Sequence, residues 1–237
     1  MLPPNLSPQL ALDLGLDPRT SFESFFPGPN AQPLAAARAC ADGSGEQVLY
    51  LYGGPGLGKT HLLQSACRCA AEAECPAVYL PLHDALAWPL QVLEGLDALA
   101  LVAVDDLQLA AGQPEWQAAL FHLFNRVRDG GGRLLFAARQ KPAELDFALA
   151  DLVSRLQSGL VLRLQDLSDE EKLRGLQLRA RQRGLELSAD AARYLLGRYP
   201  RDLAQLFVLL DRLDQASLMA QRRLTIPFIR QVLTASS

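Results

Sequence analysis

The sequence lacks the features that would carry the chain out of the cell or hold it in a membrane. No uncharged apolar run reaches the ~18 residues that a membrane span requires. The first residues, Met1 to Asn5, have neither the basic region nor the long apolar core of a signal peptide. We therefore expect a cytoplasmic protein with no membrane partner.

Cysteine is scarce, and the spacing of the four that occur argues against a zinc site. Cys67, Cys69 and Cys75 lie close together, but C-x-C followed by x5-C does not match the paired C-x2-C of zinc proteins. Together with Cys40, they are expected to be reduced and partly buried thiols.

A large excess of one charge is missing as well. The net charge is −3 over 237 residues, which argues against a protein that coats nucleic acid through bulk electrostatics. The composition, 49% hydrophobic and 21% charged, is that of an ordinary globular protein. A chain of this length fits one core domain with a smaller appendage.

What the sequence does contain is a phosphate-binding loop. The stretch GGPGLGKT matches G-x-x-x-x-G-K-[ST] at every fixed position, and it follows the apolar run Val48–Tyr52. In that context a strand delivers the chain, backbone N–H groups curl around a phosphate, and a helix begins at the lysine. We predict binding of ADP or ATP with magnesium, the lysine reaching the terminal phosphates and the threonine hydroxyl holding the metal. The predicted nucleotide-binding residues here are Gly53, Gly54, Pro55, Gly56, Leu57, Gly58, Lys59, Thr60 and His61.

Two acids follow a second apolar run. Residues 99–104 read as a fully buried parallel strand that ends in Asp105 and Asp106. Carboxylates at the carboxyl end of such a strand lie beside the phosphate loop, since ligands bind at that edge of the sheet. Asp105 is therefore the candidate for the outer sphere of the magnesium ion, and Asp106 the candidate for orienting an attacking water.

The element pattern predicts an α/β core. Expected strands at 48–52, 77–80, 99–104, 133–138 and 159–164 alternate with expected helices at 31–41, 59–74, 84–93 and 115–129. This alternation predicts a five-stranded parallel sheet between two helical layers.

From Ser168 onward only helices are expected. A capping box at Ser168–Glu171 opens a helix that ends at Gly184, and Ser188 caps a second helix. Pro200 begins a third helix, and Thr225–Pro227 begins a short fourth. We thus expect an N-terminal peptide and linker at 1–20, a nucleotide-binding core at 21–165 and a small all-helical lid at 166–237.

The N-terminal segment leaves two interpretations open. Leu10, Leu12 and Leu14 alternate within Gln9–Leu14, so an extended backbone puts them on one side. They form either a short edge strand or a linear peptide that docks into an apolar pocket of a partner, with Gln9 as a polar anchor. Similarly, the phenylalanines of Ser21–Phe26 either pack near the nucleotide base or cap the core.

The order of these motifs resembles the AAA+ ATPases. The strings VAVDDLQLAAG and LFHLFNRV are similar to the central domain of the replication initiator DnaA. The strings QLALDL, SFESFFPG, LVSRL, LSDEEKLRGLQLRARQRG and RRLTIPFIRQVL resemble the Hda family, DnaA-related regulatory inactivators of DnaA. This resemblance covers essentially the whole chain.

The resemblance implies roles that spacing alone does not. Gln9, Leu10, Leu12 and Leu14 match the family peptide that binds the DNA polymerase sliding clamp, the beta subunit. Arg155 matches the arginine finger that acts in the nucleotide site of a neighbouring subunit, and Arg201 matches the lid arginine called sensor 2. The resemblance also implies that DnaA is a partner and that the protein reaches DNA only indirectly, through the clamp. It leaves open whether the protein forms a homo-oligomer. Since the sequence ends about where the lid does, no DNA-reading module is expected.

One departure from the family pattern concerns hydrolysis. Where AAA+ enzymes place a polar sensor 1 residue, this sequence has Ala137, Ala138 and Arg139, and Asp106 is shorter than the glutamate base of many AAA+ enzymes. Both features predict weak hydrolysis by the protein itself. The implied function is a nucleotide-bound adaptor that promotes hydrolysis of DnaA-bound ATP in trans. The alternatives are an autonomous AAA+ ATPase and a DnaA-like helicase loader.

Overall fold

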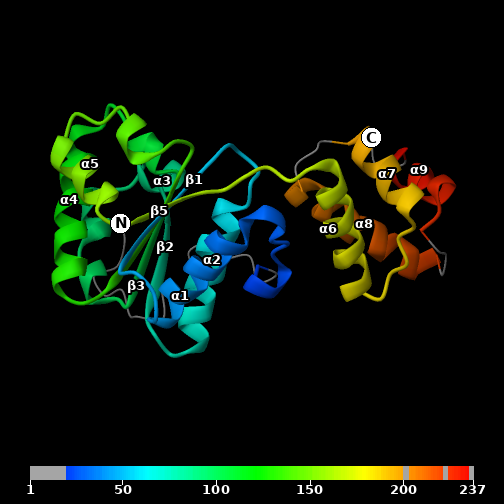
Figure 1. Ribbon diagram of the computed structural model, residues 1–237, viewed down its shortest axis with the longest axis horizontal. Coiled ribbons are helices and arrows are strands. Elements are labelled where there is room, and N and C mark those ends of the chain that lie inside the picture. The colour runs from blue at the N-terminus through cyan, green and yellow to red at the C-terminus, as the bar shows by residue number, and fades with distance from the viewer. Residues whose placement is uncertain (1–19, 200–202, 221–223, 235–237) are drawn as a thin grey trace. The chain divides into compact units, whose positions relative to one another are not determined.

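The structure is a computed structural model that describes residues 20–199, 203–220 and 224–234. The chain forms two compact units, Met1–Gln165 and Asp166–Ser237. Figure 1 labels the helices and strands of each unit. No helix within the described ranges is long and apolar enough to cross a membrane.

The first unit contains a sheet of five strands that all run parallel in the order β2-β3-β4-β1-β5. The strands are β1 (Val48–Tyr52), β2 (Ala77–Pro81), β3 (Leu101–Asp105), β4 (Arg133–Ala138) and β5 (Leu160–Arg163). The predicted five-stranded parallel sheet is confirmed. Because β1 lies between β4 and β5, the loop after β1 emerges beside the carboxyl ends of both neighbours.

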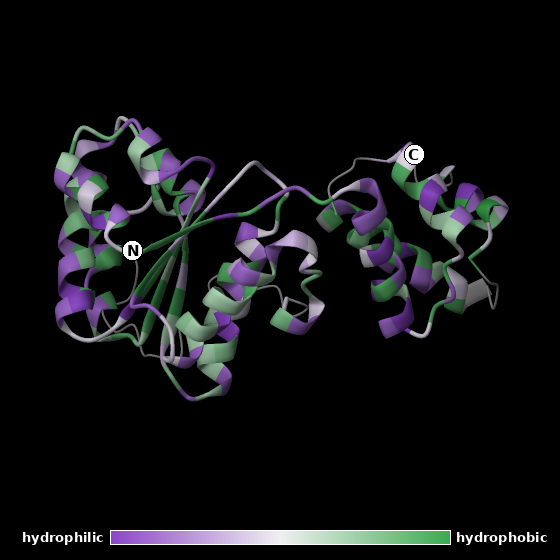
Figure 2. Ribbon diagram, viewed as in Figure 1, coloured by the Kyte–Doolittle hydropathy of each residue, from purple (hydrophilic) through white to green (hydrophobic). Residues whose placement is uncertain are grey.

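Helices cover both faces of this sheet (Figure 1). Tyr50 of β1 belongs to the apolar cluster that contains Phe124, whereas Leu49 and Leu51 belong to the cluster that contains Leu63. Successive strand residues therefore point to opposite faces, and both faces are buried. In Figure 2 the strands are accordingly largely green. The helices of this unit are α1 (Ala31–Asp42), α2 (Lys59–Glu72), α3 (Leu82–Ala85), α4 (Pro114–Asp129) and α5 (Ala150–Gln157).

One of the predicted helices is wrong. The expected helix at 84–93 is interrupted, since α3 ends at Ala85 and Leu90–Leu93 forms a separate 3-10 helix. Pro89 lies between them with an extended backbone, φ −61° and ψ 146°. Proline lacks an N–H group and disfavours the helical conformation in the residue before it, so the apolar spacing continues across a break in the helix.

The described residues of the second unit form helices joined by loops and contain no strand. Its helices are α6 (Asp169–Gln182), α7 (Ala189–Arg198), α8 (Leu203–Ala220) and α9 (Ile226–Thr234). The predicted capping box is confirmed: the Ser168 hydroxyl accepts from the Glu171 N–H, and the Glu171 carboxylate accepts from the Ser168 N–H. Gly184 ends this helix in the left-handed region, at φ 73°. The predicted helix start at Pro200 lies outside the described residues.

Candidate functional site

Two glycines give the loop after β1 its shape. The Gly53 N–H donates to the carbonyl of Ala138 at 3.3 Å, which continues the ladder between β1 and β4 by one residue. Gly53 has φ 153° and Gly58 has φ 90°. A Cβ at Gly53 would lie 2.8 Å from the Leu164 carbonyl oxygen, and one at Gly58 would lie 2.7 Å from the ring of Phe25. Only glycine fits these two positions without displacing a neighbour.

Lys59 begins α2 and bends back onto the loop. Its ammonium donates to the carbonyl of Gly53 at 2.8 Å and to the carbonyl of Gly54 at 2.6 Å. Burial is the main cause that lowers the pKa of Lys59; the charges of Asp105 and Asp106 oppose that shift. A nucleotide phosphate is a stronger acceptor than either carbonyl, so the same ammonium is suited to pair with one.

Thr60 and Asp105 form the second part of the site. The Thr60 hydroxyl donates to Oδ2 of Asp105 at 2.6 Å, and the Tyr79 hydroxyl donates to the same oxygen at 2.9 Å. The Asp106 N–H donates to Oδ1 of Asp105 at 2.8 Å. Hydroxyl and carboxylate oxygens are the ligands that magnesium prefers, so the pair of Thr60 and Asp105 fits that ion.

Asp106 turns away from the strand at the end of β3. Its backbone is left-handed, with φ 53°, which is uncommon for a residue other than glycine. Its Oδ1 accepts from Gln108 Nε2 at 2.9 Å, and its Oδ2 lies 3.6 Å from Nδ1 of His83. Gln108 Oε1 in turn accepts from the Arg139 N–H at 3.1 Å, so this amide joins the ends of β3 and β4. Gln108, His83 and Tyr79 were not predicted. The pairing of β2 with β3 brings Tyr79 and His83 to the acids, and the left-handed turn at Asp106 brings Gln108 back to it; neither leaves a sequence motif.

Arg139 is exposed at the carboxyl end of β4. Its guanidinium makes no hydrogen bond or ion pair with any residue that the structure describes. Its positive charge adds to the effect of burial in lowering the pKa of Lys59. Arg139 therefore adds a positive charge at the carboxyl end of β4, beside the ends of β1 and β3.

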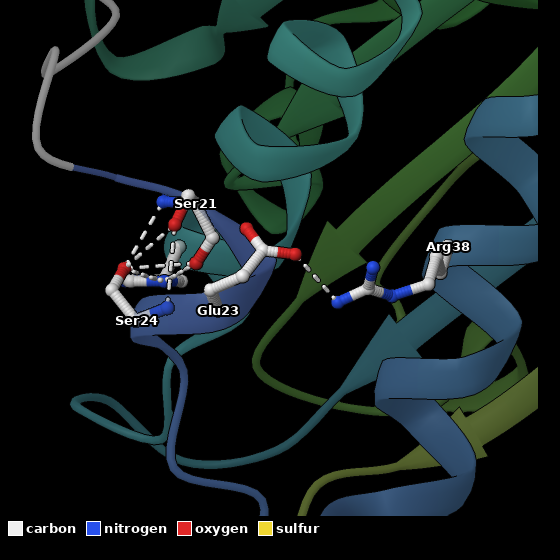
Figure 3. A network of polar contacts seen from close by, with 5 residues as sticks. Ser21, Glu23, Ser24 and Arg38 are labelled. Atoms are coloured by element: carbon white, nitrogen blue, oxygen red, sulfur yellow. Dashed lines mark hydrogen bonds and ion pairs between the residues drawn. The ribbon is translucent and has the colours of Figure 1, made fainter.

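His61 faces the first residues of the core, Ser21 to Phe25. Its Nε2 lies 2.8 Å from the Ser21 carbonyl oxygen and 3.3 Å from the Ser24 hydroxyl, and its ring centroid is 5.5 Å from that of Phe25. Ser21 and Ser24 cap one another, as Figure 3 shows.

The same close-up shows how this segment is held to α1. Arg38 donates to the Glu23 carboxylate at 3.1 Å (Figure 3) and lies over the ring of Phe22, 4.9 Å from its centroid. Phe22 is buried in the core, and Phe25 packs against the same apolar cluster and lies beside Gly58 of the phosphate loop. Both residues therefore cover the core, and packing of Phe25 near the nucleotide base stays a prediction.

Arg155 lies far along the sheet from this loop. It is in the last turn of α5, where its carbonyl accepts from the N–H and the hydroxyl of Ser158. The next residue, Gly159, is packed so closely on Val48, the first residue of β1, that a Cβ would lie 2.5 Å from the Val48 carbonyl oxygen. The phosphate loop begins after the opposite end of β1, and a five-residue strand is about 17 Å long.

The side chain of Arg155 is half-buried, on a helix that is anchored by apolar residues. Leu152 and Leu156 of α5 are buried on either side of it in the chain. Its guanidinium makes no hydrogen bond or ion pair within the described ranges of the chain. The remaining predicted site residues, Gln9, Leu10, Leu12, Leu14 and Arg201, lie outside the described residues.

Two family models match this chain. The bacterial DnaA ATPase domain matches residues 16–81 and 90–163, more than half of the chain, and the Hda lid domain matches residues 169–233. The chain belongs to the DnaA-related AAA+ family. Its lid is of the Hda type.

Solved structures agree with this membership. The DnaA-related chain is similar to domain III from the Thermotoga maritima replication initiation protein DnaA, at 26% identity and a TM-score of 0.76, over 93% of this chain and 98% of that chain. It is similar to a replication initiator DnaA bound to AMPPCP and single-stranded DNA, at 25% identity and a TM-score of 0.71, over 83% of this chain and 66% of that chain. The Thermotoga maritima RuvB branch migration motor shares the fold, at 18% identity and a TM-score of 0.65, over 91% of this chain and 72% of that chain.

Proposed function

We propose that this DnaA-related protein is a negative regulator of replication initiation that acts as a nucleotide-bound adaptor. In this proposal it binds the sliding clamp on DNA and promotes hydrolysis of DnaA-bound ATP in trans. The observation that carries the proposal is the separation of Arg155 from the phosphate loop of its own chain. Gly159 packs on the first residue of β1, whereas the loop follows the last.

The protein's own nucleotide, ADP or ATP, binds in the loop from Gly53 to His61. Lys59 pairs with the terminal phosphates, and Thr60 and Asp105 hold magnesium, which neutralises phosphate charge when it is bound. Arg201 of the lid contacts the same nucleotide. The buried Lys59 ammonium and the hydrogen bond between Thr60 and Asp105 support this assignment.

Arg155 acts on ATP held by DnaA. Its guanidinium stabilises the negative charge that develops on the transferred phosphoryl group as water attacks the γ-phosphorus. Such arginine fingers accelerate hydrolysis by ~10³ to 10⁵ in GTPases. The half-buried position on a helix anchored by Leu152 and Leu156 supports this role, because it limits the freedom of the side chain before the partner arrives.

The peptide from Gln9 to Leu14 tethers the adaptor to the clamp. The side chains of Gln9, Leu10, Leu12 and Leu14 contact the beta subunit, and DNA is met only through it. Tethering converts a weak encounter with DnaA into one at high effective concentration, restricted to clamps that are loaded on DNA. Such a protein works in the cytoplasm.

An autonomous ATPase is the second candidate. It is favoured by the complete set of Lys59, Thr60, Asp105 and Asp106 around one loop. In that reading Asp106 is the base, and copies of the chain supply Arg155 to one another in a homo-oligomer. Against it stand the engagement of Asp106 with Gln108 and a cation at Arg139 in place of a neutral sensor.

Turnover assays separate these candidates. Purified protein with ATP alone should hydrolyse slowly, and ATP loss should rise only when DnaA and DNA-loaded clamp are added. Steady turnover at ordinary enzyme rates without partners would favour the autonomous ATPase. Salt-sensitive DNA binding by the protein alone would favour a helicase loader.

A further inference from the structure

The buried hydroxyl of Tyr79 is a polar group of the site that none of these roles uses. Tyr79 lies in β2 and is 5% exposed. In the register of β2 and β3 it pairs with Ala103, and Asp105 lies two residues further along the neighbouring strand. The side chain reaches along the sheet, and its hydroxyl donates to Asp105 Oδ2 at 2.9 Å.

This bond completes a ring of contacts around one carboxylate. Asp105 Oδ2 receives the hydroxyls of both Thr60 and Tyr79, and Oδ1 receives the Asp106 N–H. The Gln64 side chain, one helical turn after Thr60 on α2, hydrogen-bonds the Tyr79 hydroxyl. The ring runs from α2 through β2 to β3 and back to α2, and those elements pack together in Figure 1.

Because Asp105 is buried, its carboxylate depends on these protein donors for its hydrogen bonds. Asp105 is 2% exposed, so water does not replace a lost partner of its carboxylate. The Tyr79 hydroxyl is one of the few donors that reach this carboxylate.

We propose that Tyr79 is the positioning residue that orients Asp105 toward Thr60 and the magnesium ion. Outer-shell partners fix the orientation of metal-binding groups, and their loss typically costs 10–100-fold in metal affinity. Without the Tyr79 hydroxyl, the Asp105 carboxylate keeps the Thr60 bond to Oδ2 and the Asp106 N–H bond to Oδ1, but it loses one of the three hydrogen bonds that fix its terminal torsion. The proposal rests on the nucleotide and magnesium binding proposed above and does not involve Arg155 or the clamp.

Tyr50 provides a matched control. It is also a buried strand tyrosine, in β1, and its hydroxyl donates to the backbone carbonyl of Gln140 at 2.9 Å. Tyr50→Phe and Tyr79→Phe each remove the hydroxyl of a buried tyrosine, but only the second removes a partner of Asp105. A general effect of losing a buried tyrosine hydroxyl should therefore appear in both variants.

The test is nucleotide binding measured as a function of magnesium. Fluorescent ADP and a fluorescent non-hydrolysable ATP analogue are titrated into wild type, Tyr79→Phe, Tyr50→Phe and Gln64→Leu, in EDTA and over a range of Mg²⁺ concentrations. For Tyr79→Phe we expect the Mg²⁺ concentration at half-maximal effect to rise about 10-fold or more. Affinity in EDTA should stay unchanged, Gln64→Leu should shift the midpoint less in the same direction, and Tyr50→Phe should not shift it.

Three results would overturn the proposal. These are an unchanged Mg²⁺ midpoint in Tyr79→Phe, an equal shift in Tyr50→Phe, or an equal loss of nucleotide affinity with and without Mg²⁺. If wild type binds nucleotide without any dependence on Mg²⁺, the magnesium part of the proposed function fails as well. If wild type depends on Mg²⁺ and Tyr79→Phe matches it, only the role of Tyr79 fails. Should Tyr79→Phe not fold, the Gln64→Leu midpoint decides, and no shift there contradicts the proposal.

Discussion

The Thr60 hydroxyl donates a 2.6 Å hydrogen bond to Oδ2 of Asp105, across 45 positions of sequence. This bond joins the first turn of α2 to the end of β3, the two elements that carry the residues suited to phosphate and magnesium. The parallel sheet brings them together, because β1 and β3 both end at the same edge. The first prediction follows from this contact.

Replacing Thr60 by valine removes the hydroxyl and keeps the shape of the side chain. We expect Mg²⁺-dependent nucleotide affinity to fall on the order of 10-fold or more, because both the metal ligand and a donor to Asp105 are lost. Titration of labelled nucleotide measures the change. Thr60→Ser keeps the hydroxyl and should bind like wild type; a valine variant that also binds like wild type would contradict the assignment.

Gly58 should not tolerate a side chain. Gly58→Ala puts a Cβ in the left-handed region and 2.7 Å from the Phe25 ring, so we expect a loss of about 1–3 kcal/mol in the free energy of unfolding. Gly54 is the control, since a Cβ there meets nothing within 4 Å, and Gly54→Ala should change stability by less than about 0.5 kcal/mol. Urea denaturation of both variants makes the comparison, and equal stabilities would be inconsistent with this geometry.

Buried thiols should make the protein less stable at alkaline pH. Burial raises the pKa of Cys40 from 9.0 to about 12, and burial also raises the pKa of Cys67. A raised folded-state pKa gives stability that is fully present below pH 9 and is lost as pH rises toward the folded value. In the pH range where a thiol is ionised in the unfolded chain but not in the folded protein, it lowers the free energy of unfolding by about 1.4 kcal/mol per pH unit.

Unfolding measured from pH 8 to pH 11 tests this prediction. The free energy of unfolding should fall less steeply with pH in Cys40→Ala than in wild type, by the contribution of one thiol. The stability that the substitution costs at neutral pH is subtracted before the slopes are compared. An alkaline slope in Cys40→Ala equal to that of wild type would show that this thiol does not titrate as proposed.

Clamp binding should depend on one side of the N-terminal peptide. Deleting residues 9–14 should abolish binding to the sliding clamp and leave nucleotide binding intact, because every residue assigned to the nucleotide site lies after the deleted segment. Clamp binding should require Leu10, Leu12 and Leu14. The controls are Ala11→Ser and Asp13→Asn, because Ala11 and Asp13 lie on the other side of an extended chain. Surface plasmon resonance with immobilised clamp measures each variant. Undiminished binding by the deletion variant would remove the tether from the account.

Much of the fold could be predicted from sequence because its signals are local. The five apolar runs gave the strands, and Ser168 and Gly184 marked the ends of α6 through side-chain and backbone chemistry of a few neighbouring residues. The phosphate loop is equally local, since eight consecutive residues carry its pattern. The predicted helix at 84–93 was wrong because the prediction followed the apolar spacing, whereas Pro89 breaks the helix in the structure.

The rest of the site depends on strand order, which no local pattern specifies. β1 inserts between β4 and β5, and this order puts Gly159 against Val48 and Arg155 at the far end of the sheet from the loop. Likewise, the Tyr79 hydroxyl reaches Asp105 only because β2 and β3 pair in one particular register. The family resemblance suggested a role for Arg155, and the sheet order is what supports the proposal that this role is exerted on another chain's nucleotide.

The most direct measurement of the central claim is hydrolysis of DnaA-bound ATP with the Arg155→Ala variant in the presence of clamp and DNA. We expect stimulation to fall by ~10³ or to background, while binding of nucleotide and clamp by the variant stays normal. Arg128→Ala, which removes an exposed arginine from the last turn of α4, should stimulate like wild type. Full stimulation by Arg155→Ala would contradict the account.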